Sequence, residues 1–241
     1  MILDLDLILD SLAPLAQGAL VTFELMLSAA GLSFLLGLAL ALLATVPVMR
    51  WVALAYVYVF RGPPFLVQLF MIYYGLPQLS FVRESFLWVV LREPFWCMLI
   101  ALVLNIAAYT AEVIRGGLLG VPKGLREAAY SLGIGPRRTF FMIVLPIALR
   151  LALPGYGNVL IGLLKCTTLA SVVTLADVTG VAKTIVARTF APYEIFITAA
   201  IFYLLVTTLL QSPSQGLTAR RGRRRNALCH APVSPKRGHG L

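Results

Sequence analysis

Long apolar runs dominate this sequence, and short polar segments separate them. A helix that crosses a bilayer needs roughly 20 predominantly apolar residues, and several runs approach or reach that length. The pattern predicts an all-α membrane protein with a single transmembrane domain over residues 18–211. Five spans are expected, at residues 18–46, 64–76, 94–116, 151–173 and 193–210.

Two adjacent prolines interrupt the second apolar run. Pro63 and Pro64 lack a backbone N–H and disfavour helix in the residues before them. We therefore expect an interfacial or inward-leaning helix over residues 51–60, then a break, and then the second span. Arg61 stands at this break in an apolar context, so its charge needs either a partner or the membrane interface.

Polar side chains collect in the third and fourth spans. Asn105, Tyr109 and Glu112 are spaced i, i+4 and i+7, which places them on one face of the third helix. Polar groups on one stripe of a membrane helix face protein or water rather than lipid. Hydrogen bonds between helices are the favoured explanation, and a pathway for a polar solute is the alternative. Thr167 and Thr168 add hydroxyl groups to the fourth span.

The longest polar segment that contains turns lies between those two spans, at residues 117–150. Pro122 suits the start of a helix, and Gly133 with Gly135-Pro136 is expected to end that short helix. A second amphipathic helix is expected over residues 137–145, broken by the proline that follows. Four apolar residues share one face of the first helix: Leu125, Ala128, Ala129 and Leu132.

The two ends of the chain differ from the apolar body. Residues 1–17 contain aspartates but no lysine or arginine, which is compatible with a segment on the outer face of the membrane. Residues 212–241 contain the run RRGRRR and three prolines without apolar periodicity, which predicts a basic disordered tail on the cytoplasmic side. A basic stretch directly after a membrane helix favours contact with anionic lipid over nucleic acid.

Charge sets the expected topology. Only 12% of the residues are charged, the net charge is +10, and soluble domains carry about 25% charged residues. With the N-terminus outside, the positive charges of residues 47–53, of residues 117–150 and of the tail all lie on the cytoplasmic side. This distribution agrees with the positive-inside rule.

The sequence lacks the residues that several kinds of chemistry require. No GxxxxGK[ST] segment is present, so the chain does not bind ATP in that manner. The transmembrane body has no histidine, no HExxH segment and no close carboxylate pair, and the three cysteines are isolated. These observations disfavour a metal site and a membrane hydrolase. Any energy source is therefore expected on a partner.

The segment EAAYSLGIGPRRTFFMIVLP resembles the EAA motif of permease subunits of bacterial ABC importers. That motif consists of EAA, a nearby glycine and a later I-x-L-P. The matching residues here are Glu127, Ala128, Ala129, Gly133, Ile143, Leu145 and Pro146.

The spans resemble one branch of that family, the polar amino acid permeases of the histidine, glutamine, arginine and opine type. Two departures stand out: Leu125 follows Gly124 where the branch usually has glutamine, and residues 212–241 lack the usual short basic amphipathic helix. Either a variant tail or a shifted reading frame would account for the second departure. The shared blocks are Arg61-Gly-Pro, Leu66-Val-Gln68, Tyr73-Tyr-Gly75, Asn105, Ala108-Tyr109, Glu112, Arg115-Gly116, Leu153-Pro154, Asn158, Leu164-Lys165, Thr167 and Leu169.

The resemblance implies a type I ABC importer permease in the bacterial inner membrane. Two permease subunits, identical or paralogous, would pair around a translocation path, and an extracytoplasmic amino-acid-binding protein would deliver the solute. A cytoplasmic ATPase dimer would use ATP and Mg, and this chain would bind no cofactor. The residues implied in coupling to the ATPase are Leu125, Glu127, Ala128, Ala129, Gly133 and Pro136.

The solute is less closely defined by these residues. A zwitterion needs both donors and acceptors at mid-depth, and opines, basic amino acids and acidic amino acids all satisfy this description. The alternative function is an ion-coupled secondary transporter or channel that acts without an ATPase, although the scarcity of membrane carboxylates argues against it. The candidate substrate contacts are Asn105, Tyr109, Glu112, Thr167 and Thr168.

Overall fold

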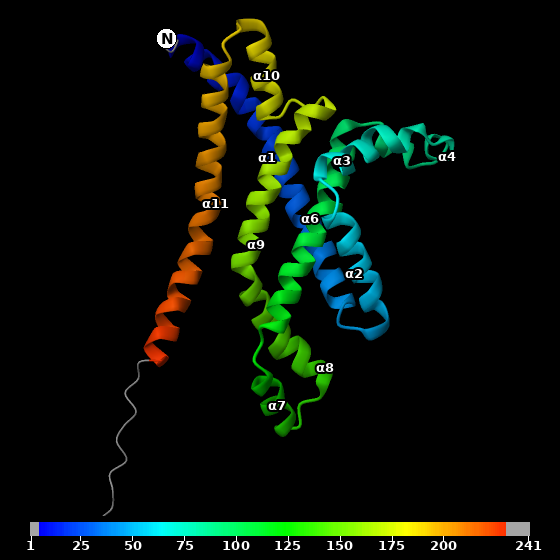
Figure 1. The fold of residues 1–241 in the computed structure, drawn as a ribbon, viewed down its shortest axis with the longest axis vertical. Helices are drawn as coiled ribbons and strands as arrows, with labels where there is room; N and C mark the ends of the chain where they lie inside the picture. Colours follow the sequence, from blue (N-terminus) through cyan, green and yellow to red (C-terminus); the bar gives the residue numbers. More distant parts are fainter. Residues whose placement is uncertain (1–4, 230–241) are drawn as a thin grey trace, which may run out of the picture.

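The computed structural model describes residues 5–229, with side chains over residues 6–211, and every element in that range is helical. Figure 1 shows an elongated bundle in which α1, α6 and α9 run beside one another. In chain order, the elements are α1 Leu5–Leu43, α2 Pro47–Arg61, α3 Phe65–Phe70, η1 Met71–Gly75, η2 Leu76–Gln78, α4 Ser80–Arg83, α5 Trp88–Leu91, α6 Pro94–Leu119, α7 Lys123–Ser131, α8 Pro136–Thr139, η3 Phe140–Val144, α9 Leu145–Thr167, η4 Thr168–Val173, α10 Val178–Thr189 and α11 Pro192–Cys229.

The centre of the bundle is the packing of α1, α6 and α9. Leu25, Leu102 and Leu163 come from these three helices and are fully buried in one apolar cluster. Small residues let membrane helices approach closely. Gly117 of α6 is such a residue, because a Cβ added there would lie 2.4 Å from the carbonyl oxygen of Ala148 in α9.

The membrane-spanning elements agree with the predicted fold class. A fifth candidate is a broken span, because α2 and the helical stretch after Pro64 meet at an angle of 96°. The predicted break is confirmed, since α2 ends at Arg61 and α3 begins at Phe65. Four helices within the described residues are long and apolar enough to cross a membrane: Asp6–Leu43, Pro94–Leu119, Pro136–Val173 and Pro192–Gln211.

The first span begins earlier than the sequence predicts. α1 starts at Leu5, so the segment 1–17 does not stand apart but continues into the span. Leu15 of this segment, and Ala19 just after it, are buried against α10 and α11. This apolar contact favours helix where the aspartates alone predict a separate outer segment, and residues 1–4 lie outside the described part of the chain.

The helix after the loop does not end at Pro146, contrary to the sequence-based prediction. A continuous helical stretch runs over Pro136–Val173, and Pro146 lies in the first turn of α9, just after the π-helical turn Phe140–Val144. A π turn shifts the hydrogen-bond register, so the helix accepts a proline without a break. The loop between the third and fourth spans, which includes α7, is therefore confined to residues 120–135. The sequence predicts a longer loop, over residues 117–150.

The last helix extends beyond its predicted end. α11 continues to Cys229, past residue 211, into the stretch that the sequence predicts to be a disordered tail. Arginine, alanine and leucine are good helix formers, and no proline falls between residues 214 and 229. Residues 230–241, the remainder of that stretch, lie outside the described residues.

Candidate translocation cavity and coupling loop

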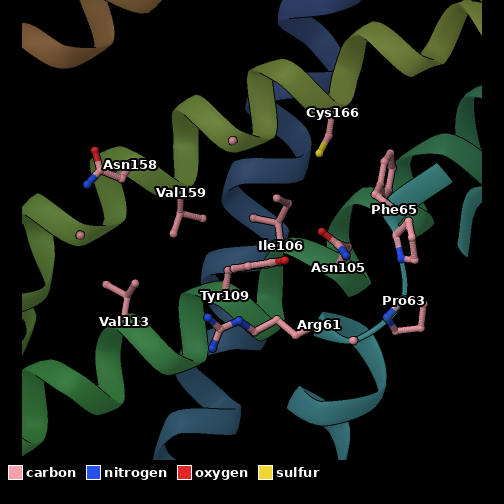
Figure 2. Close-up of a pocket in the computed structure, with 14 residues that line it drawn as sticks. Arg61, Pro63, Phe65, Asn105, Ile106, Tyr109, Val113, Asn158, Val159 and Cys166 are labelled. Atoms are coloured by element: carbon pink, nitrogen blue, oxygen red, sulfur yellow. The ribbon is translucent and has the colours of Figure 1, made fainter. Parts of the chain in front are cut away.

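A cavity of about 760 Å³ lies beside the break between α2 and α3. Figure 2 shows its walls, which come from the break, from α6 and from α9. Its volume falls within the range of small-molecule binding sites in proteins. Polar and apolar side chains are mixed in the lining, which includes Arg61, Phe65, Asn105, Ile106, Tyr109, Val113, Asn158, Val159 and Cys166.

Side-chain amides satisfy the carbonyl groups that the break leaves open. The amide nitrogen of Gln68 donates to the carbonyl oxygens of Phe60 at 2.9 Å and Pro63 at 3.0 Å. The amide nitrogen of Asn105 donates to the Phe60 carbonyl at 3.0 Å and to the Gln68 amide oxygen at 3.3 Å. Unpaired backbone groups are costly in a membrane. Asn105 therefore makes the expected bond between helices and also borders the cavity.

Arg61 is the one charged residue among those that line the cavity. Its guanidinium carbon lies 5.0 Å from the centroid of the Tyr109 ring, within the range of a cation–π interaction. Figure 2 shows these two side chains next to each other. The ion pairs found among the described residues do not involve Arg61. The cavity thus offers one cation that has no direct ion-pair partner among the described residues.

Glu112 pairs with Arg115 on the same helix. The Nε and one Nη of Arg115 donate to the two carboxylate oxygens of Glu112 at 2.9 and 2.7 Å, which is a bidentate arrangement. This pair lines a separate hollow of about 680 Å³, to which Arg61 also contributes. Of the predicted polar face, Asn105 and Tyr109 line the cavity, whereas Glu112 borders the neighbouring hollow.

The two threonines of the fourth span lie outside the lining of the cavity. Thr167 is fully buried, and its hydroxyl donates to the carbonyl oxygen of Leu164 at 2.7 Å. The hydroxyl of Thr168 donates to the carbonyl oxygen of Lys165 at 2.7 Å. Bonds of this kind satisfy a hydroxyl within its own helix. The structure therefore does not bring either threonine to the cavity.

Another face of α9 supplies the wall that the predicted contacts miss. Gly155, Asn158, Gly162 and Cys166 line the cavity, and their spacing places them on one side of the helix. The signal in the sequence is this stripe of small and polar residues within an apolar run. Arg61 is the other lining residue that the predicted contacts omit.

The loop helix α7 ends in a well-formed cap. Gly133 has a left-handed φ of +73°. Its N–H donates to the carbonyl oxygen of Tyr130 at 2.9 Å, and the N–H of Ile134 donates to that of Ala129 at 3.0 Å. These two bonds form a Schellman motif, in which glycine is strongly favoured. The helix thus ends where the sequence predicts.

One face of α7 is open, but it is narrower than the sequence predicts. Leu125 is 39% exposed and Leu132 is 79% exposed, and Ala128 is exposed between them. Ala129 is only 2% exposed, because α7 packs on α8 and η3. Ala129 therefore holds the helix in place and is not accessible to a partner, while the other three residues form an apolar face.

Hydrogen bonds of one buried threonine hold the C-terminal end of the loop in place. Glu127 is exposed and takes no part in the ion pairs found among the described residues. Pro136 begins α8. Thr139 is buried one turn later, and its hydroxyl donates to the carbonyl oxygens of Gly135 at 3.1 Å and Ile134 at 3.3 Å.

The spans, the polar cavity and the exposed loop helix together define a helical membrane permease. Residues 15–221 match the family model of the binding-protein-dependent transport system inner membrane component. The chain belongs to this family, and it is a permease subunit of an ABC transporter.

Two relatives and one solved structure show how far the similarity extends. The chain is 42% identical over 208 residues to the nopaline transport system permease protein NocM of Agrobacterium fabrum. This alignment covers 85% of this chain and 86% of the relative. The chain is 46% identical over 155 residues to the octopine transport system permease protein OccM of Rhizobium radiobacter, which aligns 64% of this chain and 63% of the relative. A crystal structure of an amino acid ABC transporter with histidines matches with a TM-score of 0.81 and 31% identity, and the match covers 91% of this chain and 100% of the other.

Proposed function

We propose that this permease imports a polar amino acid or opine through the cavity beside the α2–α3 break. The observation that carries the proposal is the cavity lining, which has one cation, the carboxamides of Asn105 and Asn158, and no acidic side chain. A carboxylate is the ligand group that an arginine and an amide donor favour. Asn158 is the amide donor that we expect to reach the solute, because the amide nitrogen of Asn105 already donates to Phe60 and Gln68. The nopaline, octopine and amino acid transporters among the similar proteins support the same solute class.

Arg61 is the residue that we expect to bind the carboxylate. It borders both the cavity and the hollow that contains Glu112. Because the Glu112 carboxylate is paired with Arg115, Arg61 is open to a carboxylate of the solute. The cation–π contact with the ring of Tyr109 positions the Arg61 guanidinium at the edge of the cavity. Apolar walls from Ile106 and Val159 suit the aliphatic part of the solute.

We further propose that the open face of α7 docks on a cytoplasmic ATPase. Two copies of that ATPase would bind and hydrolyse ATP with Mg, and this chain would bind no cofactor. Leu125, Ala128 and Leu132 supply the apolar contact, and Glu127 supplies a charge for a basic group on the ATPase. The cap at Gly133 fixes the angle at which the face is presented.

This function requires an orientation and further partners. We place the N-terminus and α10 outside, and α7 inside, in the bacterial inner membrane; they lie at opposite ends of the bundle in Figure 1. A second permease subunit, identical or paralogous, would complete the path, and an extracytoplasmic binding protein would deliver the solute. The positive-inside rule supports the orientation, because the segment around α7 contains Lys123, Arg126, Arg137, Arg138 and Arg150.

Uptake into liposomes tests the cavity assignment. The chain is reconstituted with its ATPase and binding protein, and ATP-driven uptake of radiolabelled nopaline and arginine is measured. We expect Arg61→Gln to reduce uptake of the transported solute by about 10-fold or more, the effect of losing one hydrogen bond to a charged group. Arg83→Gln is the control, since Arg83 lies outside the cavity lining. Equal uptake by both variants would contradict the assignment.

Coupling is tested separately. Glu127→Lys should abolish ATP-driven uptake and reduce co-purification of the ATPase, because it reverses an exposed charge on the docking face. Solute uptake by the purified chain without any ATPase would instead support an ion-coupled transporter or channel.

A further inference from the structure

A second cavity lies at the end of the bundle that contains α7. It has a volume of about 360 Å³ and lies between the end of α1, α2, the end of α6, α7 and η3. Three arginines from three helices line it: Arg50 from α2, Arg115 from α6 and Arg126 from α7. The cavity shares no lining residue with the translocation cavity.

The positive charge of this cavity is largely uncompensated. Arg115 is paired with Glu112 at 2.7 Å, but neither Arg50 nor Arg126 takes part in the ion pairs found among the described residues. Arg126 has a long hydrogen bond of 3.5 Å to the carbonyl oxygen of Leu118. No acidic side chain lines the cavity. Arg50 and Arg126 thus line one cavity without an ion-pair partner, and a bound anion would neutralise their charge.

The remaining surface of the cavity is mostly apolar. Leu54, Leu118, Leu119 and Phe140 contribute to the lining, and Leu119 is 72% exposed. Trp51, next to Arg50, is 76% exposed. Exposed tryptophan and leucine beside cations are typical of the membrane interface, where tryptophan lies at the level of the lipid headgroups. A small soluble anion would leave this apolar surface unused.

We propose that the cavity binds the phosphodiester headgroup of an anionic phospholipid. The planar guanidinium groups of Arg50 and Arg126 match phosphate oxygens in geometry and charge. Arg115 keeps its second Nη for the same headgroup, since its Nε and other Nη donate to Glu112. An acyl chain of the lipid would lie along the apolar side that includes Leu119. Basic pockets between membrane helices on the cytoplasmic side suit such headgroups, and this side follows from the orientation proposed above.

The consequence is a lipid contact at the base of the coupling loop. Arg126 lies directly before Glu127 in α7, and the other two arginines belong to α2 and α6. A bound headgroup would therefore connect the loop helix to two membrane helices without any protein–protein contact. This role is independent of which solute the permease carries.

Native mass spectrometry of the full chain in complex with its ATPase tests the proposal. The probe is phosphatidylglycerol, with phosphatidylcholine as the neutral comparison. We expect R50Q/R126Q to weaken phosphatidylglycerol binding by about 30-fold, the change expected for two cations lost from a headgroup site. R50K/R126K keeps both charges and should retain most of the binding. R137Q/R138Q is the matched control, because both arginines are exposed on the same loop but outside the cavity.

Several outcomes would overturn the assignment. Unchanged phosphatidylglycerol binding in R50Q/R126Q, or an equal loss in R137Q/R138Q, would leave only unspecific attraction to the basic surface. Displacement of the lipid by millimolar inorganic phosphate would identify a soluble anion as the ligand. Thermal unfolding in detergent checks that R50Q/R126Q is folded, and the single variant R50Q, at an exposed position, provides the same comparison if it is not.

Discussion

Gly116 and Gly117 are neighbours in α6, yet only one of them faces another helix. A Cβ on Gly117 would lie 2.4 Å from the carbonyl oxygen of Ala148, whereas a Cβ on Gly116 would have no atom within 4 Å. The residue type is the same, but the surroundings differ completely. The pair therefore separates the effect of close helix packing from the general effect of glycine in a helix.

Gly117→Ala should lower the stability of the protein. A methyl group there forces α6 and α9 apart, and overpacking of this kind costs about 1–3 kcal/mol. Gly116→Ala should be neutral or slightly stabilising, because alanine favours helix over glycine by roughly 0.5–1 kcal/mol. Thermal unfolding of both variants in detergent is the measurement, and equal midpoints would contradict the packing argument.

The amide groups at the break allow a second comparison of single residues. Gln68→Leu removes the side-chain donor of the Pro63 carbonyl, whereas Asn105→Leu leaves the Phe60 carbonyl with its bond from Gln68. We expect Gln68→Leu to cost about 1–3 kcal/mol of stability and Asn105→Leu to cost less. The double variant should cost more than the sum of the two. Unfolding in denaturant measures all three, and additive effects would show that the bonds act independently.

At the scale of elements, sequence and structure agree where local chemistry decides. The break at Pro63-Pro64 and the end of α7 at Gly133 follow from the restricted backbone of proline and the free backbone of glycine. Pro146 shows the limit, because its effect depends on a π turn that only the packing of the helix fixes. The same limit explains why the sequence predicts a substrate contact for Thr167 and none for Gly155. The sequence of an apolar helix does not reveal which side faces protein and which faces lipid.

The cap of α7 gives a test at this scale. Gly133→Ala places an alanine in a left-handed conformation at a cost of about 1–2 kcal/mol, although a Cβ there meets nothing within 4 Å. We expect weaker ATPase association and slower ATP-driven uptake from a folded protein. Gly135→Ala is the control, because Gly135 has a φ of −63° and equally open surroundings. Similar losses in both variants would argue against the cap.

A buried aspartate at the start of α10 makes the stability of the protein depend on pH. Asp177 is buried and accepts hydrogen bonds from the N–H groups of Thr179 at 3.2 Å and Gly180 at 3.0 Å. Burial raises the pKa of the Asp177 carboxyl above its usual value, even though these bonds oppose the shift. The folded state thus binds the carboxyl proton more tightly than the unfolded state does. The resulting stability is complete below the usual carboxyl pKa and is lost as the pH rises through the raised value.

Asp177→Asn should remove this dependence. Relative to the variant, the unchanged protein should lose unfolding free energy as the pH rises through that window. Thermal unfolding of both proteins across the acidic range measures the difference. A difference that does not vary with pH would show that the carboxyl titrates alike in the folded and unfolded states.

At the scale of the whole molecule, the two ends of the bundle must lie on opposite sides of the membrane. Thr184 in α10 and Ser131 at the end of α7 are both exposed, and Figure 1 shows these two helices at opposite ends of the bundle. With the native cysteines replaced, Thr184→Cys should react with an impermeant thiol reagent added to spheroplasts. Ser131→Cys should react only after the membrane is opened. The reverse pattern would invert the proposed orientation, although the membership of the family would stand.

The continuous helix over Pro136–Val173 has a mechanical consequence. Its 38 residues form a rod of roughly 57 Å at the usual rise per residue. One end carries the loop, and the face with Gly155 and Asn158 forms a wall of the cavity farther along. The tight contact between Gly117 and Ala148 lies between them, and we expect the helix to pivot there. If α7 docks on the ATPase as proposed, we expect a displacement of the loop to tilt the cavity wall. The π turn at Phe140–Val144 lies between the loop and this contact, so its stiffness would set how much of the displacement reaches the wall.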